Sequence, residues 1–247
     1  MTAKLIHIWR HPVKSHGREA LDQVTLYPGK TMPWDRTWAV AHEASAADGS
    51  EWVPCANFSR VAKAPSLMAI TARFEEDSGV LHLSHPDLPD LTVNPDNDPD
   101  ALIKWAAPIM PEGRAASARV LRVPGRGMTD TPFASISIGN LATHRAIEQK
   151  VGHSLSLHRW RINLWLDGLE PWQEFDWVGK QVLIGDVVLK IEEPIERCMA
   201  TTANPETGVR DADTLGALNS WGHQDMGVYG VVQTGGLMSL GDSAGPV

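Results

Sequence analysis

Hydrophobic and polar residues alternate over short stretches along most of the chain, which is the pattern of strands with one buried face. The first stretch covers residues 4–9, and a loop over residues 10–17 follows it. Further stretches cover residues 20–26, 36–41, 67–74, 80–83, 118–123, 134–138 and 161–166. The pattern therefore predicts that strands dominate the fold.

Three pairs of strands are predicted to form hairpins, because short glycine-containing segments join them. The pairs are residues 181–184 and 187–191 around Gly185-Asp186, residues 228–233 and 237–240 around Gly235-Gly236, and residues 67–74 and 80–83 across residues 75–79. Of the three, the Gly185-Asp186 turn carries the strongest signal, since a two-residue turn of this type matches the twist of the strands it joins.

Helices are few in the predicted fold. Asn140 can cap the N-terminus of a helix that continues to Val151, and Gly152 follows as the terminating residue. A second short helix is expected over residues 101–110. Residues 85–100 are rich in proline and aspartate, which predicts a surface loop.

The predicted fold class is therefore mainly β with a few short helices, in which the strands close or nearly close into barrels. With 247 residues, the chain is long enough for one large or two small domains. A boundary is expected within residues 111–130, which divides the chain into domains of residues 1–115 and 116–247.

Net charge and hydropathy exclude several partners. The chain has 22 Lys and Arg against 30 Asp and Glu, a net charge of −8, which disfavours nucleic-acid binding. It has no apolar run approaching 18 residues, so no membrane span is expected. Its first residues do not form a signal peptide, and we expect a cytoplasmic protein.

Two cysteines, Cys55 and Cys198, lie 143 positions apart and are expected to be reduced thiols. Cys198 follows Arg197 and precedes a turn-rich segment, so it is a candidate nucleophile or soft-metal ligand. A buried, inert cysteine is the alternative. Cys55 is expected to be structural. The ten histidines do not show the spacing of a zinc site.

Basic residues lie beside several predicted strands, notably Lys14, Arg36 and Arg161. If they converge in space they form an anion site; otherwise each is a surface ion pair. Gly125-Arg126-Gly127 is a weak candidate for a phosphate loop because no helix follows it.

Several segments together resemble the MOSC superfamily, the molybdenum cofactor sulfurase C-terminal type, preceded by the N-terminal β-barrel module found in many members. The resemblance covers nearly the whole chain, and the arrangement is similar to that of the mitochondrial amidoxime-reducing component and its bacterial relatives. The segments that carry it are His11-Pro12-Val13-Lys14-Ser15, Trp34-Asp35-Arg36-Thr37-Trp38, residues 131–137, Arg161-Ile162-Asn163, Gly185-Asp186 and residues 197–208. The last of these, with Arg197-Cys198 followed by Thr201-Thr202, is the most specific.

The resemblance implies a MOSC-type β-barrel that binds the molybdenum cofactor, a pterin dithiolene with a phosphate. It assigns Cys198 as the catalytic residue and as the protein ligand to molybdenum. The positions implied to bind the cofactor are Lys14, Arg36, Ser137, Arg161, Asn163, Arg197, Thr201 and Thr202. Ile162 and Asn204 depart from the family pattern, where proline and aspartate are common, and neither change removes a ligand.

The function implied by the resemblance is an oxidoreductase that reduces small N-hydroxylated substrates. The chain contains no second cysteine cluster and no dinucleotide fingerprint, so electrons are expected from a separate flavin or iron–sulfur protein. Two alternatives stay open: a sulfur transferase or carrier with a persulfide on Cys198, and a cofactor carrier without turnover.

Overall fold

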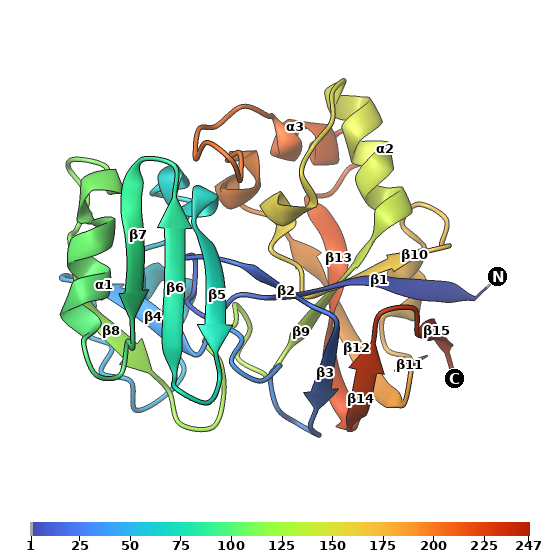
Figure 1. Ribbon diagram of the computed structural model, residues 1–247. Coiled ribbons are helices and arrows are strands. Elements are labelled where there is room, and N and C mark those ends of the chain that lie inside the picture. The colour runs from blue at the N-terminus through green and yellow to red at the C-terminus, as the bar shows by residue number, and fades with distance from the viewer. Residues whose placement is uncertain (1) are drawn as a thin grey trace.

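The larger lobe of the molecule is built around a closed barrel of seven strands, seen in the computed structural model, which describes residues 2–247 (Figure 1). The strands follow the order β10-β9-β13-β12-β11-β15-β1, and β1 returns to pair with β10. They are β1 (Ala3–Arg10), β9 (Ile136–Asn140), β10 (Leu164–Asp167), β11 (Gln181–Ile184), β12 (Val187–Glu196), β13 (Asp225–Thr234) and β15 (Ser243–Pro246). The prediction of a mainly β fold with a closed barrel is confirmed.

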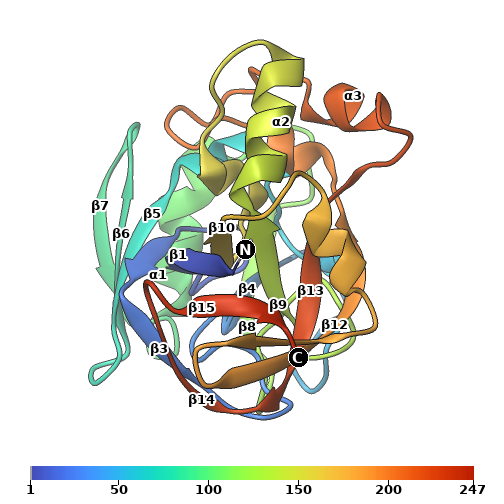
Figure 2. The same cartoon turned by 90° about the vertical axis from the view of Figure 1, so that its right-hand side faces the viewer.

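Alternating side chains of the barrel strands fill its interior. On β12, for example, Val187, Leu189 and Ile191 are fully buried, whereas the residues between them are partly exposed. Seen from the side in Figure 2, the first and last strands lie next to each other, and β1 pairs with β15 at Ala3 and Ala244. The barrel core is therefore assembled from both ends of the chain.

One strand pair of the barrel, β9 and β10, is parallel, and a crossover through helix α2 (Leu141–Val151) connects it. The Asn140 side chain accepts a hydrogen bond from Ala142 N at 2.9 Å, and Gly152 ends the helix at φ 92°. The cap and the terminating glycine expected from the sequence are both confirmed.

The smaller lobe holds two small antiparallel sheets and one helix, drawn on the left in Figure 1. Its elements are β4 (Trp38–His42) paired with β8 (Ser117–Arg122), the sheet of β5 (Thr71–Glu75), β6 (Val80–His85) and β7 (Leu88–Val93), and helix α1 (Pro99–Ala106). A separate apolar core that includes Leu67, Leu81 and Leu102 lies among them.

Short elements complete the fold. They are strands β2 (Glu19–Leu21), β3 (Gln23–Leu26) and β14 (Gly236–Ser239), helix α3 (Thr214–Asn219), and 3-10 helices at Cys55–Asn57, Pro65–Ala69, Ala107–Ile109, Leu157–Trp160, Gln173–Trp177 and Met199–Thr202. Since β1 pairs with β10 and β15, the N-terminal residues belong to the larger lobe. The domain division at residues 115 and 116 stays a prediction from the sequence.

Two of the predicted elements are wrong. Residues 85–100 are not a loop, because they contain β7 and the start of α1. Pro89 is tolerated there because β7 is an edge strand, and Asp98 caps α1 by accepting from Ala101 N at 3.1 Å. The last expected hairpin is also absent, since β14 pairs with β3 rather than with β13.

Several predicted strands begin later than expected. Arg36 and Arg161 have left-handed backbone conformations, with φ of 51° and 50°, so β4 begins at Trp38 and β10 at Leu164. Residues 65–69 form a 3-10 helix before β5, and β2 and β3 are separate strands divided at Asp22. The displaced strand starts place both arginines in turns at the junction of the lobes.

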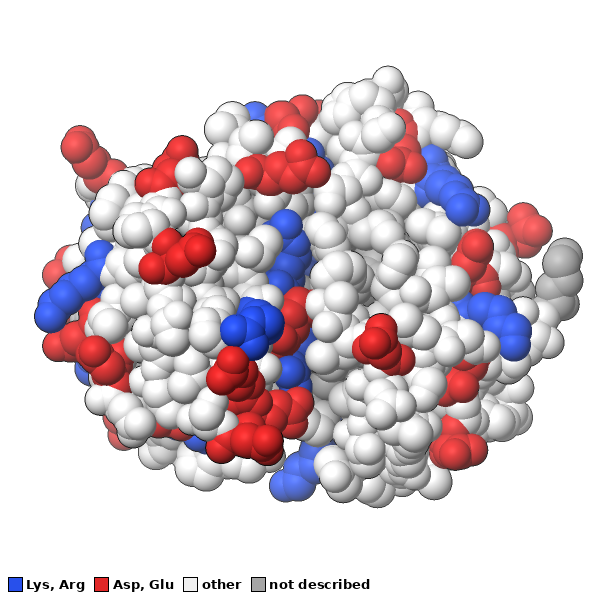
Figure 3. Space-filling view, in the orientation of Figure 1, with Lys and Arg blue, Asp and Glu red and all other residues white. Residues whose placement is uncertain are grey.

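Acidic and basic side chains are interspersed over the face drawn in Figure 3, and both kinds lie in the furrow between the two lobes. Within residues 2–247, no helix is both long enough and apolar enough to cross a membrane.

Candidate functional site

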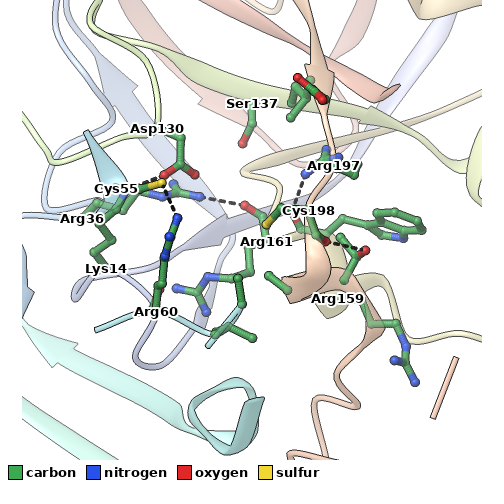
Figure 4. Close-up of a pocket in the computed structure, with 18 of the residues that line it drawn as sticks. Lys14, Arg36, Cys55, Arg60, Asp130, Ser137, Arg159, Arg161, Arg197 and Cys198 are labelled. Atoms are coloured by element: carbon green, nitrogen blue, oxygen red, sulfur yellow. Dashed lines mark hydrogen bonds and ion pairs between the residues drawn. The ribbon is translucent and has the colours of Figure 1, made fainter. Parts of the chain in front are cut away.

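A cavity of about 210 Å³ lies between the lobes and is lined by residues from both halves of the chain. Of the nine residues that the resemblance assigned to the site, seven line it: Lys14, Arg36, Ser137, Arg161, Arg197, Cys198 and Thr201. The convergence expected for Lys14, Arg36 and Arg161, which span 147 positions, is therefore found. Figure 4 shows the side chains of Lys14, Arg36 and Arg161 around one space.

Cys198 is exposed and directly precedes the 3-10 helix Met199–Thr202, so its thiol is accessible from the cavity. Thr201 holds this turn: its N and its Oγ1 each donate to the Cys198 carbonyl at 3.1 Å. Thr202 does not line the cavity; its Oγ1 donates to the Met199 carbonyl at 2.9 Å and accepts from the Arg210 guanidinium. The two threonines thus stabilise the backbone that presents the cysteine.

Arg197 is buried and its guanidinium is satisfied by backbone carbonyls. Nε donates to Met226 O at 2.8 Å and Nη1 donates to Trp160 O at 2.9 Å. Burial lowers the pKa of Arg197 to about 10, and the side chain stays charged at neutral pH. Arg197 therefore ties β13 to the turn before β10 and adds a positive charge next to Cys198.

Lys14 lies in the loop after β1 and is almost fully buried. Its Nζ donates to Met128 O at 2.8 Å and to Asp130 Oδ1 at 2.5 Å. Burial by itself would raise the pKa of Asp130, but Lys14 and Arg36 together lower it to about 2. At neutral pH this wall of the cavity thus carries a formed ion pair.

Arg36 is held from both sides. Its guanidinium pairs with the buried carboxylate of Asp35, and Nη2 donates to the Arg161 carbonyl at 2.8 Å. Burial alone would raise the pKa of Asp35, but Arg36 and His11 hold it well below its usual value. His11 N donates to the same carboxylate at 2.8 Å, so the loop carrying Arg36 is anchored to the loop after β1.

The Arg161 side chain is the exception among these cations. Its Nη1 and Nη2 are buried and have no hydrogen-bond partner among the described residues. Burial, followed by repulsion from Arg36, lowers the pKa of Arg161 to about 9. A buried guanidinium without a counter-ion is unfavourable, and an anion bound in the cavity would remove the penalty.

Ser137 and Asn163 form a closed hydrogen-bond pair between β9 and the segment before β10. Ser137 Oγ donates to Asn163 Oδ1 at 2.8 Å and accepts from Asn163 N at 3.0 Å. Asn163 also donates to the Trp9 carbonyl at 3.0 Å. Asn163 does not line the main cavity but a recess of about 10 Å³ behind it. Its observed contacts position the strands that carry Ser137 and Arg161.

The cavity lining also includes residues that the sequence interpretation did not assign to the site, among them Asp130, Cys55 and Arg60. Cys55 was expected to be structural, yet it faces the cavity and accepts from Arg60 Nη1 at 3.1 Å. No sequence pattern marked Cys55 and Arg60 as site residues. They lie in an irregular segment, and the packing of the smaller lobe determines where that segment lies.

Gly125-Arg126-Gly127, the candidate phosphate loop, has a structural role. Arg126 donates to the carbonyls of Thr131 at 2.9 Å and Phe133 at 3.0 Å, which fixes the segment carrying Asp130. A Cβ on Gly127 would lie 2.1 Å from the Asp35 carbonyl oxygen, so only glycine fits there.

Comparisons with known proteins agree with this architecture. Residues 2–116 match the MOSC N-terminal beta barrel domain and residues 127–244 match the MOSC domain, and the chain belongs to this family. It is 30% identical over 126 residues to the human Mitochondrial amidoxime-reducing component 1, an alignment that covers 45% of this chain and 36% of the human protein. The chain therefore matches about a third of the length of that relative.

Two solved structures are distantly similar. The YuaD protein from Bacillus subtilis has 12% identity and a TM-score of 0.47, with 99% of this chain and 94% of that chain covered. YiiM from Geobacillus stearothermophilus has 18% identity and a TM-score of 0.37, with 45% and 53% covered. Likenesses at this level carry no argument about function.

The residues present fit the molybdenum cofactor with which the family is associated. An accessible thiol, Cys198, can supply a soft ligand, and the unpartnered guanidinium of Arg161 can receive a phosphate. Within residues 2–247, no group of three or more His, Cys, Asp or Glu could hold a metal ion. A cofactor that brings its own dithiolene needs only one thiolate from the protein.

Proposed function

We propose that this protein binds the molybdenum cofactor and uses it to reduce N-hydroxylated small molecules. The observation that carries the proposal is the meeting of the exposed Cys198 thiol and the unpartnered Arg161 guanidinium in one cavity. The name of the human relative, an amidoxime-reducing component, supports this reaction class.

Each side chain has a defined task in this proposal. Cys198 ligates the metal, Arg161 and Lys14 bind the anionic and polar groups of the cofactor, and the Arg36–Asp35 pair holds the Arg161 backbone in place. Arg197, Thr201 and Thr202 keep the Cys198 turn in shape. When bound, the cofactor supplies the redox chemistry, and the protein supplies binding, orientation and electrostatics.

The net reaction breaks the N–O bond of a hydroxylamine or amidoxime. Two electrons and two protons enter: one proton is added to the nitrogen, and the other joins the hydroxyl group, which leaves as water. The electrons come from a separate flavin or iron–sulfur protein, because the sequence contains no cysteine cluster or dinucleotide motif for an internal relay. We place the protein in the cytoplasm, where Cys55 and Cys198 stay reduced.

The test is to express the protein in a host that makes the cofactor and to measure bound molybdenum and pterin. Reduction of benzamidoxime is then followed with reduced viologen as the electron source. Cys198→Ser removes the ligand, and Cys55→Ser is the matched control because it also changes a cavity thiol to a hydroxyl. We expect molybdenum to be lost in the first variant and retained in the second.

The two alternatives give different results. A persulfide on Cys198 without bound pterin would favour sulfur transfer, and bound cofactor without reduction of any N-hydroxylated compound would favour a carrier. Molybdenum retained at the wild-type level in Cys198→Ser would refute the ligand assignment.

A further inference from the structure

The cations of the cavity differ in whether they already have an oxygen partner. Lys14 and Arg36 pair with carboxylates, and Arg197 donates to backbone carbonyls. Among the described residues, two lining guanidinium groups make no hydrogen bond to oxygen: the buried Arg161 and, nearer the surface, Arg60. The cofactor phosphate accounts for Arg161 in the proposed function. Arg60 has no role in it.

Backbone hydrogen bonds on both sides of Arg60 hold the position from which its side chain extends. Ser59 N donates to Val40 O at 2.8 Å, and the Arg60 carbonyl accepts from Lys63 N and Ala64 N, both at 2.9 Å. Figure 4 shows the Arg60 side chain extending into the cavity, where its guanidinium meets the Cys55 sulfur. A thiol is a weak acceptor, so the guanidinium keeps most of its hydrogen-bonding capacity for a ligand.

A second cavity, of about 200 Å³, also uses Arg60 as part of its wall. Its lining also includes two further basic residues, Lys63 and Arg114, and a histidine, His42. No Asp or Glu is among its lining residues. Arg60 therefore faces a positive environment from two sides, which favours an anion over a neutral group.

Two carboxylates line the main cavity, and Asp130 is already paired with Lys14. The position of the other, Glu196, gives the cavity a direction. Glu196 lines the main cavity two residues before Cys198 and forms no ion pair with any described residue. It disfavours an anionic group at the Cys198 end. A ligand with one anionic end is therefore oriented with that end at Arg60 and its other end toward Cys198.

We propose that Arg60 binds a carboxylate on the substrate, so that the protein prefers N-hydroxylated compounds that carry a carboxylate away from the N–O group. The planar guanidinium matches a carboxylate in a two-point contact. The substrate part of this inference rests on the proposed function, whereas the carboxylate site does not.

The kinetic test compares benzamidoxime with 4-carboxybenzamidoxime in the cofactor-loaded protein with reduced viologen. The wild type should favour the carboxylated compound, mainly through a lower KM. Arg60→Gln should reduce the ratio of kcat/KM for the carboxylated over the neutral compound at least tenfold. Arg60→Lys should restore part of the ratio because it keeps the charge. Arg73→Gln, which removes an exposed arginine outside both cavities, should leave the ratio at the wild-type value.

A binding test separates this inference from the proposed function. Calorimetry of benzoate and benzamide with the same proteins should show tighter benzoate binding to the wild type and loss of the difference in Arg60→Gln. If neither amidoxime is reduced but the benzoate preference holds, the proposed reaction is wrong and the Arg60 site stands. Equal benzoate binding to wild type and a folded Arg60→Gln, or an unchanged kinetic ratio, would overturn the inference.

Discussion

Arg161 offers a test in which stability and cofactor binding should change in opposite directions. Its guanidinium is buried without a partner, and burial lowers its pKa from the ordinary arginine value to about 9. One pKa unit corresponds to about 1.4 kcal/mol, and relaxation of the protein around the charge reduces the total energy. We therefore expect the buried charge of Arg161 to destabilise the cofactor-free protein by about 3 kcal/mol.

Arg161→Met removes the charge and keeps much of the side-chain volume. The backbone of residue 161 has φ 50° in either case, and the Arg161 carbonyl that accepts from Arg36 is unaffected by the side chain. The cofactor-free variant should therefore be more stable than the wild type by about 3 kcal/mol in denaturant unfolding, while it fails to retain the cofactor.

Arg36→Met is the matched contrast. Arg36 pairs with the buried Asp35 carboxylate, so its removal leaves an uncompensated charge and should destabilise the protein by about 3–5 kcal/mol. Added phosphate provides a second check: it should stabilise the cofactor-free wild type and have a much smaller effect on Arg161→Met.

The pH dependence has a definite sign. Above pH 9 the folded protein holds fewer protons on Arg161 than the unfolded chain does, so the penalty falls as the pH rises. The stability difference between the wild type and Arg161→Met should therefore be smaller at pH 10.5 than at pH 8. A cofactor-free Arg161→Met that is less stable than the wild type at pH 8 would refute the reasoning.

Three further predictions follow from the cavity and its surroundings. Burial lowers the pKa of His16 to about 4, so between pH 6.5 and 4 the unfolded chain binds a proton that the folded protein does not. As the pH falls through that range, denaturant unfolding should show a loss of up to about 3 kcal/mol of stability. The loss should be smaller in His16→Gln. Lys14→Gln should weaken cofactor retention by about 1.5–3 kcal/mol, measured as pterin content after dialysis, and unchanged pterin would contradict it. The isolated, loaded protein should be inactive with NADH alone and become active when a flavin or iron–sulfur reductase is added; turnover with NADH alone would contradict the need for a partner.

Elements with local signals could be predicted from the sequence alone. Helix α2 has its cap at Asn140 and its terminating glycine at Gly152, and the Gly185-Asp186 turn joins β11 and β12, as expected. In each case a few adjacent residues satisfy the backbone groups of the element, so no distant contact is needed. The closed barrel and the MOSC family were likewise predicted from the strand pattern and the motifs.

Contacts between distant segments, and the place of a strand within its sheet, could not be predicted in this way. β14 pairs with β3, a partner far away in the chain. Residues 88–93 pair with the neighbouring strand β6, and Pro89 is tolerated there because the assembled sheet leaves β7 at its edge. Pairing registers are set by burial of the assembled sheet, which local sequence does not encode.

The candidate site, too, could be predicted from the sequence only in part. Motif residues such as Cys198 and Arg161 could be named from the sequence, but their partners could not. Arg36 has a carboxylate beside it in the sequence, Asp35, whereas the absence of a partner for the buried Arg161 guanidinium follows from how the two lobes pack, and so does the presence of Arg60 in the same cavity as the motif cysteine. The charge balance of a buried cavity is a sum over contacts between distant segments, and those contacts exist only in the folded chain.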